Sequence, residues 1–406
     1  MERGAAAAKR EHAAVEEKEA RFRSILELTR QLVREPSPAG SKGRERVLWI
    51  AGAWLRDHGL EATTIEHNGR PIALLGTAGT PGPGRTLCLN ACADTAPVED
   101  VGRWSADPFG GEIADGWMYG RGAADSKVAI AVFCHLLRDW ADAADRIGNL
   151  VVLFDGDEHT GRFRGVQRFI ADGPRVDAAM IGYPGLDTVR DGARGFWRAT
   201  ISVFGAEEHS GSSRGGGDNA VLRAAELVRR FGQVELDEDD DAFGLSPQLT
   251  VTGIDGGRGF SVVPDRCRVR VDIRVTPDWQ PDDARNLAFD SVEWLDRTFP
   301  CSRRSRIHEW KGWPAYRLGG RDPVVMALRR GAEAAMGRRI STRPAGPSNI
   351  GNFLAAVGVP ATCGFGVRYR GVHGVDECFE TATVPTVTRA YELAIRNFFE
   401  LAEAVD

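Results

Sequence analysis

Several features that mark whole classes of protein are missing from this sequence. No apolar run approaches the length of a membrane-spanning helix, and the N-terminus has no continuous apolar segment of the kind that a signal peptide needs. The seven cysteines are scattered, odd in number and never spaced as Cys-x-x-Cys, which argues against a disulfide framework and favours a reducing compartment. The sequence therefore predicts a cytoplasmic protein that does not insert into membranes.

Basic stripes, and aromatic residues interleaved with lysine and arginine, are also missing. The net charge is −5 at pH 7, so the chain lacks the electrostatic footprint of a protein whose main partner is nucleic acid. What the chain does have is size and apolar content. Its 406 residues exceed the usual limit for one core, and 42% of them are hydrophobic, which predicts two domains.

Hydrophobic spacing predicts a layered first part of the chain. The first 21 residues have the composition of a charged, alanine-rich helix, and residues 44–58 carry apolar side chains at helical spacing. Beyond them, short apolar runs alternate with helical stretches, which is typical of an α/β layer with a mostly parallel sheet. The expected strands are 72–75, 87–91, 150–154 and 178–181, and the expected helices between them are 126–140 and 164–170.

The pattern changes near residue 196 and changes back near residue 306. The middle part alternates strictly between apolar and polar residues, as half-exposed antiparallel strands do. Its expected strands are 197–203 and 267–275, with helices at 219–231 and 281–297; later helices are expected at 323–335 and 384–403, and a strand at 360–366. The predicted division is a helical extension (1–21), a discontinuous α/β domain (22–190 and 306–406) and a smaller inserted α+β domain (191–305).

Polar clusters follow the expected strands of the α/β layer, where open α/β folds build their sites. Any one of them alone has an ordinary structural explanation, such as a helix cap or a satisfied histidine. Four in one layer predict a functional site. They are Cys92 with Asp94, Asp125 at the end of GRGAAD, Asp157 with Glu158 and His159 in FDGDEHTG, and His373 in GVHGVDE.

Longer motifs around these clusters resemble the metallo-aminoacylase and peptidase family that includes acetylornithine deacetylase, succinyl-diaminopimelate desuccinylase, aminoacylase and glutamate carboxypeptidase. The motifs are WSADPFGGEIADGWMYGRGAADSK (104–127), FGAEEHSGSS…GDNAV (204–221), GFSVVPDRCRVRVDIR (259–274) and VHGVDE (372–377). The resemblance implies a zinc-peptidase-like α/β catalytic domain with an inserted α+β lid. It also implies that the lid joins two copies into a homodimer.

The resemblance further implies a site for two zinc ions bridged by Asp125. One metal would take a histidine at position 92 and an acidic residue at position 183, and the other would take a glutamate at position 159 and the histidine at 373. Glu158 would be the general base that activates water. Asp94 would orient the ligand at position 92.

This chain departs from the family at three of the five ligand positions, which hold Cys92, His159 and Tyr183. His159 is a good ligand, so Asp125, His159 and His373 still offer the three donors that suit catalytic zinc and equally a non-haem iron(II). Cys92 and Tyr183 make a degenerate second site with too little negative charge for a second dication. We expect one metal, or none: zinc first, with iron(II), manganese or cobalt as alternatives. A nucleophilic Cys92 is less favoured than a small buried one.

Residues of the lid and of one later loop match family positions that contact substrate. By resemblance, His209 would stabilise the oxyanion in the partner subunit's site, and Arg274 would bind a substrate carboxylate, as a guanidinium can. Asn349 in GPSN would also contact substrate. The implied partner is a small molecule that carries a carboxylate.

Three functions remain open from the sequence. The first is a metal-dependent amidohydrolase that cleaves a small N-acyl amino acid or a dipeptide-like substrate, with Glu158 as the base. The second is a relative with little or no metal that catalyses a non-hydrolytic acyl or condensation step in specialised metabolism. The third is a dimer that binds without catalysis.

Overall fold

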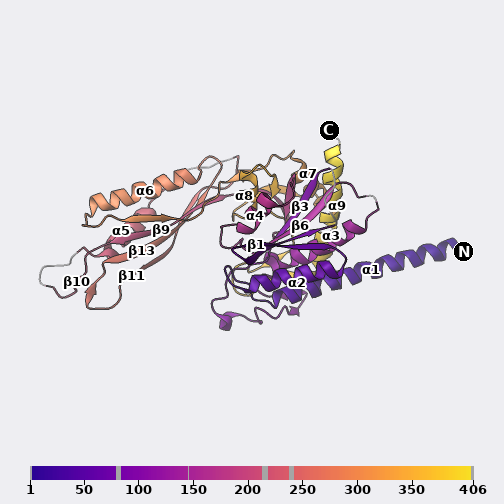
Figure 1. Cartoon of the computed structure of the whole chain (residues 1–406), viewed down its shortest axis with the longest axis horizontal. Coiled ribbons are helices and arrows are strands. Elements are labelled where there is room, and N and C mark those ends of the chain that lie inside the picture. Colours follow the sequence, from indigo (N-terminus) through magenta and orange to yellow (C-terminus); the bar gives the residue numbers. More distant parts are fainter. Residues whose placement is uncertain (1, 79–83, 145, 213–217, 237–241, 404–406) are drawn as a thin grey trace. The chain divides into compact units, whose positions relative to one another are not determined.

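The computed structural model describes the chain except for residues 1, 79–83, 145, 213–217, 237–241 and 404–406 (Figure 1). It divides into two compact units, each with its own core. The first unit comprises Met1–Asp191, Leu318–Arg343 and Asn349–Asp406, and the second comprises Gly192–Arg317 and Pro344–Ser348. No helix of the described residues is long and apolar enough to cross a membrane.

The first unit is built on a six-stranded mixed sheet. Its strands, in spatial order, are β1 (Glu61–His67), β2 (Arg70–Thr77), β6 (Asn149–Asp155), β3 (Thr86–Cys92), β7 (Ala178–Ile181) and β17 (Ala361–Thr362). From β6 to β17 neighbouring strands are parallel, whereas β1, β2 and β6 pair antiparallel. The sheet is therefore parallel in the half that carries the site and antiparallel at the other edge. There β2 contains the expected strand at 72–75, whereas β1 was not expected.

Helices cover both faces of this sheet. They are α1 (Glu2–Val33), α2 (Gly43–Asp57), α3 (Val128–Asp142), α4 (Arg164–Asp172), α7 (Pro323–Met336), α8 (Ile350–Ala356) and α9 (Val384–Glu403). Neighbouring residues of β2 show the two faces, because Leu74 lies against Gly52 of α2 while Ala73 lies against Gly165 of α4. Helix α1 continues past residue 21 without a break, and its Ile25, Leu28 and Leu32 enter the core.

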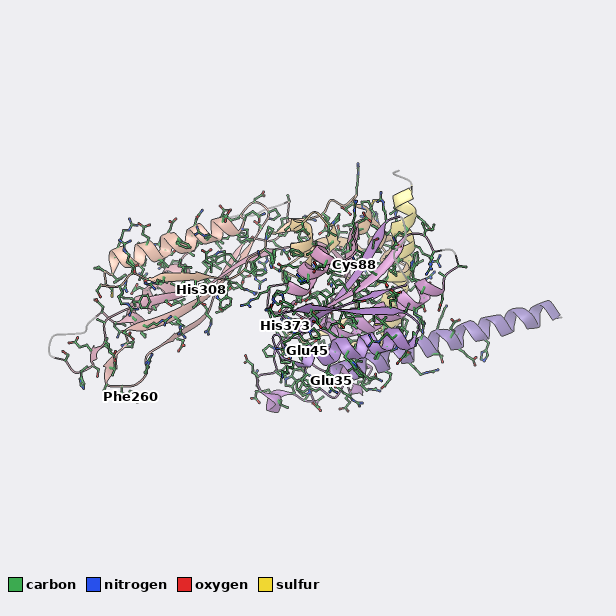
Figure 2. All side chains as sticks on the ribbon, viewed as in Figure 1. Glu35, Glu45, Cys88, Phe260, His308 and His373 are labelled. Carbon is green, nitrogen blue, oxygen red and sulfur yellow. The ribbon has the colours of Figure 1, made fainter. Side chains whose placement is uncertain are left out.

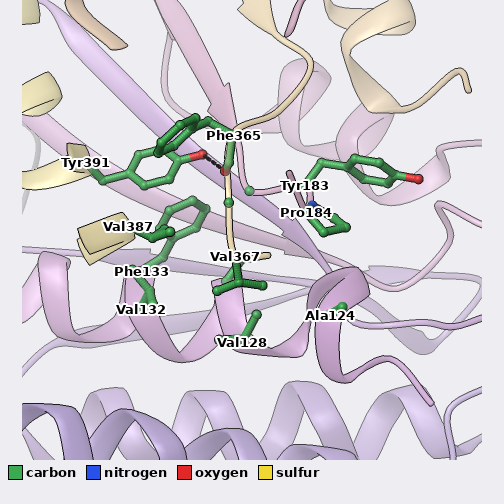
Figure 3. A pocket seen from close by; sticks show the side chains of 13 residues that line it. Ala124, Val128, Val132, Phe133, Tyr183, Pro184, Phe365, Val367, Val387 and Tyr391 are labelled. Carbon is green, nitrogen blue, oxygen red and sulfur yellow. Dashed lines mark hydrogen bonds between the residues drawn. The ribbon is translucent and has the colours of Figure 1, made fainter. Parts of the chain in front are cut away.

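A buried tyrosine in α9 ties the helical layer to the ends of two strands. The Tyr391 hydroxyl lies 2.7 Å from the Phe365 carbonyl oxygen and 3.1 Å from that of Ile181. Beside it is a cavity of about 10 Å³ among apolar side chains, including Phe133 (Figure 3). The ring of Tyr183 extends away from this apolar cluster, so the core fixes the backbone at Tyr183 without enclosing its ring.

The expected strand at 360–366 is shorter than predicted, because β17 contains only two residues, Ala361 and Thr362. Gly364 has a φ of +153° and forms a β-bridge with Arg190. A side chain at Gly364 would collide with Tyr183, whose Cβ lies 2.6 Å from the position that such a Cβ would occupy. The chain therefore turns out of the parallel sheet after Thr362.

The second unit is an antiparallel sheet with helices against it. Its strands, in order, are β11 (Gln248–Gly256), β13 (Arg266–Val275), β9 (Gly195–Phe204) and β14 (Arg306–Glu309), and its helices are α5 (Ala220–Phe231) and α6 (Pro281–Thr298). In β13 every second residue from Cys267 to Val275 is buried. The predicted alternation and antiparallel pairing are confirmed, because one face of the sheet packs on α5 and α6.

Short strands complete the fold. A four-stranded sheet has the order β18 (Tyr369–Arg370), β19 (Cys378–Glu380), β5 (Trp117–Tyr119) and β4 (Ile113–Ala114). The pair β10 (Glu208–His209) and β12 (Val262–Val263) forms a small ribbon, and β15 (Tyr316–Arg317), β8 (Thr188–Ala193) and β16 (Ser341–Ala345) form a three-stranded sheet. Pairing of β19 with β5 matters most, because it carries the loop of His373 to the segment that follows β5.

Candidate metal centre and active site

Three potential metal ligands from distant parts of the chain meet in the first unit. His373 Nε2 lies 3.0 Å from Asp125 Oδ2 and 3.2 Å from His159 Nε2. His159 Nε2 lies 3.9 Å from Asp125 Oδ2, and the ligand atoms of the three residues all lie within 4.8 Å of one another. Because zinc–nitrogen and zinc–oxygen bonds are about 2.0–2.2 Å long, one ion fits among these atoms with small adjustments. The three donors named from the sequence are therefore brought together.

The backbone at Asp125 is held by a buried carboxylate that the sequence analysis did not single out. Glu377 Oε1 accepts hydrogen bonds from the amides of Ala124 and Asp125, at 3.2 and 3.1 Å. Its other oxygen accepts a 2.6 Å hydrogen bond from Arg121, and both side chains are at most 4% exposed. Arg121 and Glu377 stand in the two motifs, GRGAADSK and VHGVDE, that also hold Asp125 and His373. Their complementary charges were the signal that could have paired them.

Asp94 holds the loop after β6, which carries Glu158 and His159, through hydrogen bonds to its backbone. The two oxygens of Asp94 each accept a 3.0 Å hydrogen bond, one from the Glu158 amide and one from the His159 amide. The resemblance implied that Asp94 would instead orient the residue at position 92. Here that residue is Cys92, which has no ring N–H to donate and lies 3.2 Å from the Ser126 hydroxyl. Asp94 in this chain therefore positions the loop.

A second interaction fixes the same loop: Asp157, which the sequence placed in the cluster with Glu158 and His159, pairs with Arg164, a partner that the sequence did not indicate. Asp157 is completely buried and forms a two-pronged ion pair with Arg164, at 2.7 and 2.8 Å. It also accepts hydrogen bonds from the Arg164 amide and the Thr160 hydroxyl. Such bidentate pairs fix geometry as well as charge. The ion pair closes the turn around Glu158 and His159, which limits the freedom of both side chains.

The electrostatics of the site separate the roles of its residues. Burial raises the pKa of Glu158 to about 7, even though the neighbouring His159 opposes the shift. Burial would lower the pKa of His159, but Glu158 and Asp94 raise it well above its usual value. Burial would raise the pKa of Asp125, yet its hydrogen bond with His373 and the charge of His159 hold that pKa below its usual range. Glu158 is thus a carboxyl group that can exchange a proton near neutral pH.

The two ring nitrogens of His159 face different groups. Its Nδ1 lies 3.1 Å from Glu158 Oε2 and 3.7 Å from Asp94 Oδ1, while its Nε2 faces Asp125 and His373. A carboxylate beside one ring nitrogen favours the tautomer that leaves the other nitrogen free to ligate. The geometry and the chemistry of this donor set therefore fit a metal ion.

Comparison with known proteins settles the family. A family model described as peptidase family M20/M25/M40 matches residues 88–397. A succinyl-diaminopimelate desuccinylase from Cereibacter sphaeroides is 29% identical over 397 residues, covering 92% of this chain and 98% of the relative. An M20 family metallo-carboxypeptidase from Sulfolobus solfataricus has a TM-score of 0.76 at 17% identity, over 92% of this chain and 99% of its own. A dinuclear metal-binding M20 peptidase from Bacillus subtilis has a TM-score of 0.67 at 13% identity, over 94% and 99%.

The chain belongs to peptidase family M20/M25/M40. The resemblance inferred from the motifs is confirmed, and so is the predicted fold class of an α/β catalytic domain with an inserted smaller domain. This M20 protein is a metal-dependent hydrolase that acts on amide bonds, which was the first of the three functions left open.

The residues at the second metal position of this M20 protein, Cys92 and Tyr183, are weak metal ligands. Burial, followed by the charge of Asp125, raises the pKa of Cys92 far above its usual value. The same two causes raise the pKa of Tyr183 well above 10. Both groups therefore keep their protons near neutral pH. Cys92 also lies with Glu158 and His159 in a possible ligand group, but a metal there would occupy the carboxylate of Glu158 and share His159.

The other residues named by resemblance have well-defined surroundings. In the second unit, Arg274 forms a 2.7 Å ion pair with Asp272 and lies 3.3 Å from the Ser348 hydroxyl. His209 is exposed, and its Nδ1 accepts a hydrogen bond from the Gly211 amide at 3.0 Å. In the first unit, Asn349 is buried and caps α8. Both ends of its amide are engaged, which gives Asn349 a structural role and leaves its substrate contact a prediction.

Proposed function

We propose that this M20 protein is an amidohydrolase that works with one divalent metal, held by Asp125, His159 and His373. The observation that carries the proposal is the convergence of these three ligand atoms beside Glu158, a carboxyl group whose pKa is about 7. Two histidines and one carboxylate suit zinc, and also suit iron(II), manganese or cobalt. A dinuclear site would need further anionic ligands at positions 92 and 183, where Tyr183 is a poor metal ligand and Cys92 adds at most one negative charge.

In this proposal Glu158 is the general base. When bound, the metal polarises the amide carbonyl and makes a water molecule more acidic. Glu158 accepts the proton of the attacking water at its carboxylate and later delivers it to the leaving amine, which a pKa of about 7 allows in both directions. Asp94 and the Asp157–Arg164 pair hold Glu158 in place through the loop that carries it.

The proposed substrate is a small N-acyl amino acid or a dipeptide-like molecule with a free carboxylate. Arg274 is the proposed carboxylate ligand, and its ion pair with Asp272 fixes the guanidinium in one orientation. We assign the chemistry to residues 22–190 and 306–406. We assign dimerisation to residues 191–305, with His209 completing the oxyanion site of the partner subunit. The desuccinylase name of the Cereibacter relative supports N-succinyl amino acids as the first substrates to test.

Two measurements test the proposal together. Elemental analysis of purified protein is expected to give at most one tightly bound divalent metal per chain. Turnover of N-succinyl-diaminopimelate, N-acetyl amino acids and dipeptides is expected to disappear on chelation and to return with one equivalent of zinc, iron(II), manganese or cobalt. Two tightly bound metals per chain would contradict the mononuclear site. Full activity in metal-free protein would replace hydrolysis by the metal-poor acyl or condensation chemistry that the altered ligands Cys92 and Tyr183 left open.

A further inference from the structure

A hollow of about 620 Å³ lies on the first unit, between α2 and the β1–β2 hairpin. It is lined by Lys42, Arg46, Trp49 and Arg56 along α2, and by Thr64 and Pro71 from the hairpin. None of the residues proposed for catalysis lines it. One acidic residue, Glu45, also lines the hollow. Glu45 and the nearby Glu35 are labelled in Figure 2. The hollow is therefore a feature that the proposed amidohydrolase function does not explain.

Four of the lining residues, three in α2 and one at its N-cap, form a single stripe. Lys42, Arg46, Trp49 and Arg56 are spaced i, i+4, i+7 and i+14, which places them on one face of the helix. Residue i+11 of that stripe is Ala53, whose small side chain leaves room between Trp49 and Arg56. Trp49 is 65% exposed, which is unusual for so large an apolar side chain. The stripe thus has cations at both ends and an exposed ring between them. The sequence analysis missed this basic stripe because its members stand three to seven residues apart and only the helix brings them onto one face.

The stripe keeps a positive charge on a protein whose net charge is −5. The two nearby carboxylates are already paired, Glu35 with Arg46 at 2.8 Å and Glu45 with Arg70 at 2.5 Å. In the part of the chain that the structure describes, no carboxylate forms an ion pair with Lys42 or Arg56. These two cations remain available to an anionic partner.

The length of the stripe decides which kind of anion it fits. Lys42 and Arg56 are fourteen residues apart, and a helix rises about 1.5 Å per residue, so about 21 Å separates them along the axis. A small metabolite cannot contact both ends at once. An extended peptide rises about 3.3 Å per residue, so about six residues span the same distance. Aromatic and arginine side chains are also the ones that contribute most at protein interfaces.

We propose that this groove binds an extended acidic peptide segment of a partner protein. Carboxylates of the segment pair with Lys42 at one end and Arg56 at the other, and an apolar side chain packs on Trp49 between them. The arrangement of cation, ring and cation complements a sequence in which acidic residues flank an aromatic one. The site is separate from the catalytic residues, so occupancy and catalysis are measured independently.

The test uses the full-length protein and a fluorescein-labelled heptapeptide, Glu-Asp-Glu-Phe-Glu-Asp-Glu, followed by fluorescence anisotropy. The control peptide is Gln-Asn-Gln-Phe-Gln-Asn-Gln. We expect the acidic peptide to bind at least tenfold more tightly than the neutral one, with affinity falling as salt is raised. Lys42→Glu with Arg56→Glu, and Trp49→Ala separately, are expected to weaken binding at least tenfold. Arg389→Glu, an exposed charge reversal on α9, is the matched control and is expected to bind like wild type.

Thermal unfolding and amidase turnover of each variant are expected to match wild type, because these side chains are exposed and none of them is proposed to take part in catalysis. Equal binding of both peptides, or wild-type affinity in the groove variants, would overturn the proposal. It would also fail if inorganic phosphate or a short oligonucleotide competed as effectively as unlabelled acidic peptide. Loss of dimers in the Lys42→Glu, Arg56→Glu variant would assign the groove to a second copy of this chain instead.

Discussion

The main chemical question at the residue scale is how an M20 site works with three altered ligand positions. The substitutions are not equivalent, because histidine is a common ligand of catalytic metals whereas tyrosine is a poor one and Cys92 adds at most one negative charge. Asp125, His159 and His373, which offer metal-binding atoms, lie close to one another, and Glu158 lies beside His159. A decaying site would lose donors without this selectivity, so the pattern favours a modified active site.

Replacing Glu158 by glutamine tests the general base. Glutamine keeps the size of the side chain but cannot accept a proton, so turnover is expected to fall by roughly 10²–10⁴-fold. Metal content should stay at the wild-type value, because Glu158 is not one of the proposed ligands. Steady-state kinetics and elemental analysis measure the two quantities. Unchanged turnover would remove Glu158 from the mechanism.

His159→Ala and Cys92→Ala form a matched pair for the metal centre. His159→Ala removes one of three donors and is expected to lose the tightly bound metal. Cys92→Ala removes a protonated thiol and is expected to keep it, at a modest cost in stability from the lost buried sulfur. Inductively coupled plasma analysis of both proteins checks the expectation. If only the Cys92→Ala variant lost the metal, the ligands would instead be Cys92, Glu158 and His159.

Arg274→Ala tests the carboxylate ligand. An interaction that is present in both the ground and transition states affects substrate binding and not the chemical step. KM for an N-acyl amino acid is therefore expected to rise at least tenfold, with kcat little changed. The matching substrate control is the corresponding N-acyl amine without the carboxylate, which wild type and variant should turn over alike. A KM that did not change would return Arg274 to a structural role beside Asp272.

At the element scale, helix α3 contains a buried histidine that links stability to pH. His135 lies 2.8 Å from the Ala131 carbonyl oxygen and 2.9 Å from the Ser24 hydroxyl, and it packs on Trp54. Burial lowers the pKa of His135 from 6.5 to about 3. The helix therefore holds a neutral imidazole that the unfolded chain would protonate in mild acid.

His135 is expected to contribute to acid sensitivity. Because the folded-state pKa is the lower one, the unfolded state binds the extra proton between about pH 6.5 and pH 3. This contribution to stability is complete above pH 6.5 and is lost as the pH falls, at up to about 1.4 kcal/mol per pH unit. His135→Gln should flatten the dependence of the free energy of unfolding on pH from 6.5 to 4.5. A slope in His135→Gln equal to that of wild type would contradict this assignment.

At the scale of the whole molecule, the inserted unit presents the edge of a sheet. Strand β11 ends the four-stranded sheet on one side and β14 ends it on the other, and open edges of this kind are usually covered by another chain or element. Sedimentation velocity at micromolar concentration is expected to show a homodimer. A monomer at that concentration would remove His209 from the partner subunit's site and weaken its proposed oxyanion role.

The sequence by itself determined the class of the molecule. The 3.6-residue spacing of apolar side chains marked helices such as α6 and α9, and the period of two marked β9 and β13, because each pattern reflects which face of one element is buried. Motifs around Asp125, Glu158 and His373 carried the family. The sequence also identified His159 as a potential metal ligand, since histidine can bind a metal in any fold.

Only the tertiary structure decided what those residues touch. Asp125 and His373 are 248 residues apart, and their 3.0 Å contact exists because β19 pairs with β5. The partner of Asp94 and the clamp of Asp157 by Arg164 depend on how the loop after β6 turns. The raised pKa of Cys92 depends on its burial. Burial results from the packing of the whole unit, so the residues next to Cys92 in the sequence do not predict it.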